Sequence, residues 1–136
     1  MIVVDTNVIL HFWLPGEFQP LAQKLIKLDP NWITVPLWRS EMRNVLKNYF
    51  KAGLISREMV YNVIISAEGQ MGENEIPVTS KEVLDITLNH NCSAYDAEFV
   101  ALSKKLSFSL ISCDKKLAKE FPKEVSELRK YVNAAI

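Results

Sequence analysis

The fold is decided at the start of the chain, by the six residues Ile2-Val3-Val4-Asp5-Thr6-Asn7. Three β-branched residues in a row are typical of a strand that is buried on both faces of a sheet. Polar residues that favour helix N-caps follow at once, and the apolar stretch Val8–Trp13 then indicates a helix. A buried strand that leads directly into a helix predicts an α/β fold with a mostly parallel sheet.

The rest of the chain continues this alternation of short apolar runs and longer segments of helical period. Further strands are predicted at 32–35 and 108–112. Helices are predicted at 20–28, 37–51, 56–70, from Thr79 onward, at 94–106 and at 115–121. Residues 76–78 are at most a short edge strand. The tail from Pro122 to Ile136 predicts a helix rather than a strand, because Val125, Leu128 and Val132 have helical spacing.

Length and composition predict a single domain that covers residues 1–136. The chain is 49% apolar and 24% charged, with 4 Gly and 6 Pro, which excludes collagen-like, low-complexity and disordered classes. Cys92 and Cys113 do not make a disulfide framework, and a zinc site is not expected from 2 His without a CxxC pair. Free thiols without a signal peptide predict a cytoplasmic protein, and no apolar run is long enough to cross a membrane.

The charge balance limits how the protein can bind nucleic acid. Sixteen Lys and Arg residues match sixteen Asp and Glu residues, so the formal net charge is zero. Binding through bulk positive charge is therefore not expected. Nucleic acid remains a possible ligand if the positive charge is local, or if a bound cation reverses the sign of the site.

Four acids occupy positions that favour a functional site. Asp5 and Asp114 each follow a predicted strand directly, where open α/β sheets bind ligands. Asp96 projects from an apolar side of its helix, and Glu41 lies near the start of its helix at the edge of a buried stripe. Each also has a structural interpretation, because the three Asp residues fit helix caps and Glu41 fits the helix macrodipole. The other acids, Glu98 among them, are predicted to be solvated.

Taken together, the four acids predict a metal site. In a parallel sheet all four positions come to the same edge, where the carboxylates would repel one another unless a cation neutralised them. Oxygen ligands without Cys or His suit Mg²⁺ or Mn²⁺. A hydrated ion held in this way is suited to phosphodiester hydrolysis, because it orients and activates water and offsets negative charge in the transition state.

Four sequence motifs that contain these acids resemble the motifs of the PIN-domain ribonucleases, and of the VapC-type toxins in particular. Val3–Asn7 is similar to the first motif of that family, and Ser93–Leu102 is similar to the third. Pro36–Leu46 resembles the second motif, a proline followed by a helix that bears an acid. Ile111–Leu117 resembles the fourth, in which a hydroxyl lies two residues before an acid. The resemblance extends from Ile2 to about Phe121.

The resemblance implies a three-layer α/β/α domain and a catalytic metal site of Asp5, Glu41, Asp96 and Asp114. It implies cleavage of RNA with Mg²⁺ or Mn²⁺, a homodimer and, for the toxin branch, a small antitoxin as partner. Asp5 and Asp96 are expected to be the principal ligands, with Glu41 and Asp114 completing the site directly or through water. Members of the family usually end in a short edge strand, which the tail of this chain does not predict.

Neighbouring polar residues are candidates for supporting roles. Thr6, Asn7 and Ser112 are candidates for hydrogen bonds that hold the carboxylates in place, although turns and caps also use such residues. Arg39 and Arg43 belong to a basic stripe on one predicted helix and are candidates for contacts with RNA phosphates. The same stripe also fits a solvated helix face. Lys115 adjoins Asp114 and is a third candidate for a phosphate contact.

Two other functional classes fit part of the pattern. A PIN-like module that binds RNA or protein without cleaving it would also have the fold, although the intact set of acids argues against it. Mg²⁺-dependent phosphatases and phosphoreceiver domains place acids at strand ends too. A receiver needs a pair of acids after the first strand, and a phosphatase needs a second Asp two residues after its nucleophile. Position 6 is Thr and position 7 is Asn, which disfavours both.

Overall fold

The computed structural model describes residues 1–135, and Ile136 lies outside this part. Its centre is a sheet of the strands β1 (Ile2–Val4), β2 (Trp32–Ile33), β3 (Leu110–Ser112) and β4 (Val125–Glu127). The strand order is β2-β1-β3-β4, and every pairing is parallel. The predicted α/β architecture is confirmed, with a sheet that is parallel throughout.

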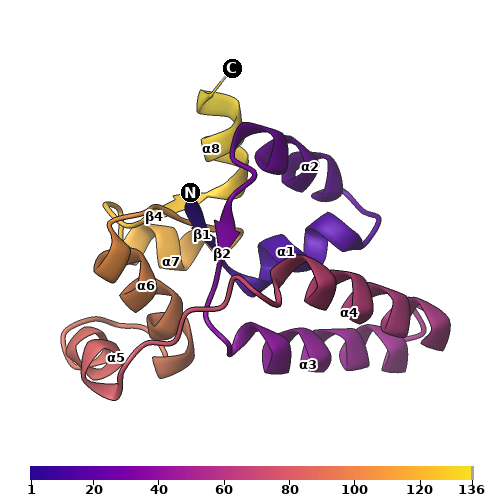
Figure 1. The fold of residues 1–136 in the computed structure, drawn as a ribbon, viewed down its shortest axis with the longest axis horizontal. Coiled ribbons are helices and arrows are strands. Elements are labelled where there is room, and N and C mark those ends of the chain that lie inside the picture. The colour runs from indigo at the N-terminus through magenta and orange to yellow at the C-terminus, as the bar shows by residue number, and fades with distance from the viewer. Residues whose placement is uncertain (136) are drawn as a thin grey trace.

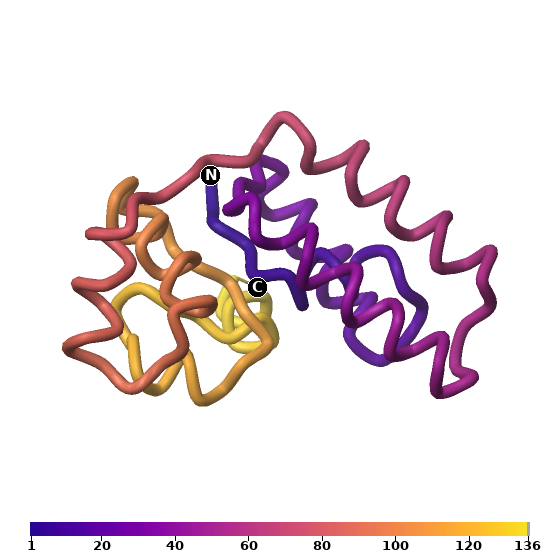
Figure 2. The backbone as a smooth tube through the Cα atoms, turned by 90° about the horizontal axis from the view of Figure 1, so that it is seen from below, coloured from indigo at the N-terminus to yellow at the C-terminus, as the bar shows by residue number. Residues whose placement is uncertain are grey.

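Eight helices surround the strands in the described part of the chain (Figure 1). They are α1 (Thr6–Trp13), α2 (Gln19–Leu28), α3 (Trp38–Lys51), α4 (Arg57–Met71), α5 (Ser80–Thr87), α6 (Ala94–Leu106), α7 (Lys115–Glu120) and α8 (Leu128–Ala134). Helices α5, α6 and α7 lie on one side of the sheet, and α1 to α4 lie on the other. Figure 2 shows α3 and α4 as an antiparallel pair that projects away from the strands.

The tail of the chain corrects one prediction. Residues Val125–Glu127 form strand β4 beside β3, and only the following residues form a helix, α8. Val125, Leu128 and Val132 are all buried, so their helical spacing reflects a strand and a helix that share one core. A strand of three residues is too short to show its own alternation. The edge strand typical of the family is therefore present.

The core holds the strands and the helices that carry the candidate acids. Val3, Val4 and Ile111 are fully buried, as expected for strands covered on both faces. Trp38 at the start of α3 and Phe99 in α6 are also fully buried, which anchors these two helices against the sheet. Because α6 leads back into a parallel strand, it runs opposite to the strands, and its first turn lies at their carboxyl ends.

The strand order defines a switch point between β1 and β3. The chain passes from β1 to β2 on one side and later adds β3 and β4 on the other. Connections leave the carboxyl ends of β1 and β3 in opposite directions, which opens a crevice at this edge. The residues that follow these two strands are therefore the first candidates for a binding site. No helix within residues 1–135 has the length and apolar character needed to span a membrane.

Two glycines, one at the tip of the α3–α4 pair and one near the end of α4, allow a test of the backbone. Gly53 has a φ of +75°, whereas Gly69 lies within α4 with open space around the position of a Cβ. We expect Gly53→Ala to lower the free energy of unfolding by about 1–2 kcal/mol, because alanine is strained at positive φ. Gly69→Ala should raise it by about 0.5–1 kcal/mol. Urea denaturation measures both, and equal effects of the two changes would contradict the described backbone.

Candidate functional site

Asp5 is the innermost acid of the site at the carboxyl edge of the sheet. Its side chain follows β1, and the residue is 7% exposed. Oδ1 accepts a hydrogen bond from the backbone N–H of Thr6 at 2.7 Å, and Oδ2 accepts one from the Ser112 hydroxyl at 2.8 Å. Burial raises the pKa of Asp5 to about 7, and the Ser112 hydrogen bond opposes this rise. A carboxylate that is buried yet oriented by two donors is suited to bind a cation.

Ser112 and Asn7 connect the loops that follow β1 and β3. The Asn7 side chain donates to Ser112 Oγ at 3.4 Å and accepts from the backbone N–H of Cys113 at 3.1 Å. Ser112 Oγ also accepts from the backbone N–H of Asp114 at 3.0 Å. These bonds hold the residues after the two strands in one arrangement, so Asp5 and Asp114 keep a common frame.

Glu41 joins the site from the first turn of α3, which follows β2. Its Oε1 accepts a hydrogen bond of 2.6 Å from the Thr6 hydroxyl, which links α3 to the start of α1. Partial burial raises the pKa of Glu41, and the nearby charge of Asp96 raises it further. The three predicted supporting residues thus form hydrogen bonds with the acids or with one another.

Asp96 lies in the first turn of α6 and faces the same edge. Ser93 caps this helix, since its hydroxyl accepts from the backbone N–H of Asp96 at 3.0 Å. The reciprocal bond of a capping box, which Glu82 makes to Thr79 in α5, is not found for Asp96 within the described residues. Burial and the nearby charge of Asp114 raise the pKa of Asp96. The Asp96 side chain is therefore coupled to the site and is not required for the cap.

Asp114 caps a helix and also lines a pocket. Its Oδ1 accepts hydrogen bonds from the backbone N–H groups of Lys116 at 2.9 Å and Leu117 at 3.1 Å, which caps α7. The same residue lines a pocket together with Asp96. A cap formed through one carboxylate oxygen leaves the other oxygen for a ligand.

Glu98 is a fifth acid near the site, and the prediction that it is solvated is wrong. Its side chain is partly buried, and burial together with the charge of Glu41 raises its pKa. Lys105, which shares its helix face by spacing, pairs with Glu82 instead. The helical pattern of α6 could not reveal this, because Glu41, whose charge acts on Glu98, belongs to a helix distant along the chain.

The chemistry of the acids fits Mg²⁺ or Mn²⁺, although the carboxylates do not close around a single point. No group of three Asp, Glu, His or Cys side chains within residues 1–135 is spaced to hold a metal ion directly. The pKa of Asp5, Glu41 and Asp96 is raised in each case, partly by neighbouring negative charge, which a cation would neutralise. Mg²⁺ usually keeps several waters and needs only one or two carboxylates as direct ligands.

The basic residues predicted to contact substrate have different surroundings. Arg39 forms ion pairs with Glu68 and Glu75 and so ties α3 to α4 and the loop after it. Its guanidinium is engaged in the fold, so we do not extend the phosphate prediction to it. Arg43 and Lys115 are exposed and remain predictions. Lys116 and Lys119 line the pocket beside Asp96 and Asp114. The sequence analysis did not name Lys119 as a candidate. Its i, i+3 spacing from Lys116 indicates that both lysines lie on one side of the helix.

Comparison with known proteins shows the family of this chain. Residues 2–121 match the family model described as PIN domain. The chain belongs to the PIN domain family. A relative, Ribonuclease VapC3 of Pyrobaculum aerophilum, is 25% identical over 124 residues, which cover 89% of this chain and 95% of that protein. The family match and this relative place the chain in a family that includes nucleases and toxins.

Solved structures share the fold at low sequence identity. The crystal structure of PAE2754 from Pyrobaculum aerophilum has a TM-score of 0.78 and 15% identity, and covers 99% of this chain and 90% of that one. The crystal structure of FitAcB from Neisseria gonorrhoeae has a TM-score of 0.70 and 17% identity, over 95% and 99% of the two chains. A structure of FitAB bound to IR36 DNA has a TM-score of 0.69 and 16% identity, over 94% and 95%.

The raised pKa of Asp5 predicts how stability depends on pH without metal. Between about pH 4 and pH 7 the folded protein binds more protons than the unfolded chain, so the free energy of unfolding falls as pH rises. With chelator present, we expect Asp5→Asn to be more stable than the wild type at pH 8, by on the order of 2 kcal/mol, and to lose this advantage near pH 4. Urea denaturation at both pH values measures the difference.

The exposed Asp85 of α5 provides the control, since it pairs with Lys81 in solvent. Asp85→Asn should change stability by less than about 0.5 kcal/mol at either pH. An Asp5→Asn protein that is less stable than the wild type at pH 8 would contradict the prediction that the buried charge of Asp5 is unfavourable without metal.

Proposed function

We propose that this protein is an endoribonuclease that cleaves RNA phosphodiester bonds with Mg²⁺ or Mn²⁺. The observation that supports this most strongly is the environment of Asp5. A carboxylate with a pKa of about 7 is buried at the switch point of a parallel sheet, beside Glu41 and Asp96. A protein that used Asp5 only as a helix cap would gain nothing from gathering other acids around it, because each adds repulsion.

The acids divide into two groups in this proposal. Asp5 and Asp96 would hold the ion directly, and Glu41 and Asp114 would hold it directly or through water. The bound ion would activate water and offset charge on the scissile phosphate. Thr6 orients Glu41, and Ser112 orients Asp5, through the hydrogen bonds described above. One of the carboxylates would accept the proton of the attacking water, and a pKa raised towards neutrality suits that task.

We also propose that the protein is the toxin of a toxin–antitoxin pair, with a small antitoxin as partner, and that it acts in the cytoplasm as a homodimer. The relation to a VapC ribonuclease supports the toxin role. The zero net charge supports a partner chain or a second copy as the source of part of the positive surface that RNA requires. A PIN-like module that binds RNA without cleaving it is the alternative, and the experiment below distinguishes it.

A cleavage assay tests the metal mechanism. We expect single-stranded RNA to be cut in Mn²⁺ or Mg²⁺ and left intact in excess chelator. Asp5→Asn and Asp96→Asn should each lower the rate at least about 100-fold, since loss of a ligand should exceed the loss caused by its supporting residues. The matched control is Asp85→Asn, which should cut at the wild-type rate. Cleavage that persists in chelator, or in Asp5→Asn, would contradict the proposal, and binding without cleavage would favour the alternative.

The two roles of Asp114 can be separated by two substitutions. Asparagine is as good an N-cap as aspartate, so Asp114→Asn should keep the stability of the wild type while lowering the cleavage rate. Asp114→Ala should lower the rate and also reduce the free energy of unfolding by about 1 kcal/mol. Thermal denaturation and single-turnover cleavage measure the two effects. Full activity in Asp114→Asn would show that the residue serves only as a cap.

A further inference from the structure

A pocket of about 510 Å³ opens directly beside the acids of the site. Asp96 and Asp114 form part of its lining, and the rest comes from the loop before α6 and from α7. Its volume lies within the usual range of pockets for small ligands, about 300–1,000 Å³. The pocket is therefore large enough for one nucleotide next to the place where an ion would be held.

Two lysines line this pocket together with three acids, Asp96, Asp114 and Glu120. Lys116 and Lys119 lie three residues apart on α7, so both side chains reach the same side of the helix. Neither pairs with an acid within residues 1–135, whereas Lys81, Lys104, Lys105 and Lys130 each do. Two exposed cations that are free of carboxylate partners are suited to phosphate groups.

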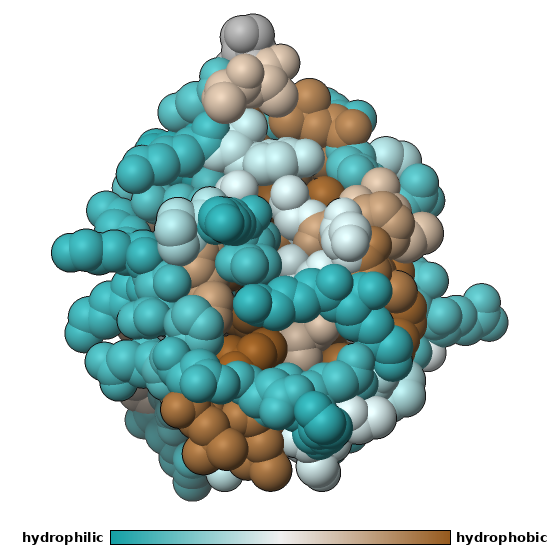
Figure 3. Space-filling model, turned by 90° about the vertical axis from the view of Figure 1, so that its left-hand side faces the viewer, coloured by the Kyte–Doolittle hydropathy of each residue, from teal (hydrophilic) through white to brown (hydrophobic). Residues whose placement is uncertain are grey.

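The remaining lining offers one polar group to a base or a sugar. Asn91 contributes an amide that can both donate and accept hydrogen bonds, whereas Leu117 is only 3% exposed. Glu120 also lines the pocket, but its Oε2 lies 3.1 Å from Nδ1 of His90, which engages this carboxylate at the rim. The side of the molecule that carries α5 to α7 shows many hydrophilic side chains with apolar patches between them (Figure 3).

We propose that this pocket binds the nucleotide adjacent to the scissile phosphate, with Lys116 and Lys119 on the RNA backbone. The cleavage role of the neighbouring acids rests on the function proposed above, whereas the RNA contact can be tested without cleavage. The RNA chain would then run along α7 on its way to or from the acids. Lys115, which does not line the pocket, contributes less than Lys116 and Lys119.

Binding to RNA in chelator tests the pocket. The probe is a fluorescein-labelled, single-stranded RNA decamer of mixed sequence, titrated with the full chain and followed by anisotropy between 50 and 200 mM salt. Lys116→Ala/Lys119→Ala should bind more weakly than the wild type. The slope of log affinity against log salt should become shallower by about 0.7 if the lysines share one phosphate, or by about 1.4 if each contacts its own.

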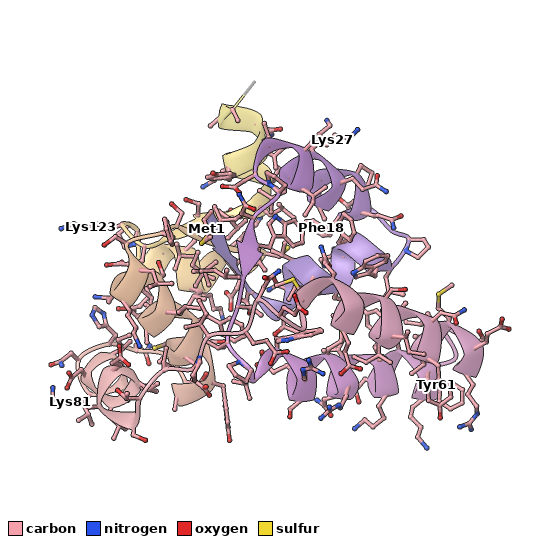
Figure 4. All side chains as sticks on the ribbon, viewed as in Figure 1. Met1, Phe18, Lys27, Tyr61, Lys81 and Lys123 are labelled. Carbon is pink, nitrogen blue, oxygen red and sulfur yellow. The ribbon has the colours of Figure 1, made fainter. Side chains whose placement is uncertain are left out.

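Lys24→Ala/Lys27→Ala is the matched control. These lysines have the same spacing on α2 and are exposed, and Figure 4 shows Lys27 at the upper right, on the other side of the strands from α7. The control removes the same charge from a place outside the pocket. The slope should therefore stay at the wild-type value. Equal slopes for both double variants would mean that only overall charge matters and would overturn the pocket. Circular dichroism and thermal denaturation establish that each variant is folded.

Cys92 provides a second, independent readout. It lines the pocket and is a free thiol, whereas Cys113 is a free thiol that does not line it. RNA should slow alkylation of Cys92 at least several-fold in chelator, relative to the same protein without RNA, as measured by mass spectrometry. This protection should be lost in Lys116→Ala/Lys119→Ala. Absence of protection in the wild type would overturn the proposal.

A parallel cleavage assay in Mn²⁺ separates the two proposals. A shallower slope and Cys92 protection without any cleavage would reject the nuclease function and retain the pocket as an RNA site. Cleavage with an unchanged slope and no protection would reject the pocket and retain the nuclease. If both proposals are correct, Lys116→Ala/Lys119→Ala should raise KM more than it lowers kcat. These lysines would bind the RNA and would not contact the metal ion held by the acids.

Discussion

The hydrogen bond from Ser112 to Asp5 is the interaction on which the site depends. It joins the ends of β1 and β3 across the switch point, and it supports a charge in a place that water barely reaches. A buried carboxylate is costly, and two donors offset only part of that cost, as the pKa of about 7 indicates. A cation bound at this place, as proposed above, would remove the remaining cost of the buried charge.

The other acids arrive at the same edge for topological reasons. Parallel strands end together, so the residues after β1 and β3 meet. Helix α6 runs against the strands and brings Asp96 to the edge with its first turn. Glu41 comes from the start of α3 and is held there by Thr6. Each position is ordinary by itself, and the shared negative charge arises only from their combination.

An acid that caps a helix can also line the pocket in this molecule. Asp114 caps α7 through one oxygen and still lines the pocket beside Asp96. At α6, Ser93 forms the cap, which frees the Asp96 carboxylate for the site. A substitution at Asp114 therefore alters the stability of α7 and the charge of the site together. A substitution at Asp96 alters chiefly the charge.

The sequence by itself determined the strand-then-helix pattern, because a β-branched run such as Val3-Val4 can be buried on both faces only in a covered sheet. It also indicated which four acids to examine, since strand ends and first turns meet at one edge. Only the tertiary structure decided the edge strand β4, the burial of Glu98, the ion pairs of Arg39 and the pocket with Lys119. These depend on which elements lie side by side, and local periodicity holds no information about a neighbour that is distant along the chain.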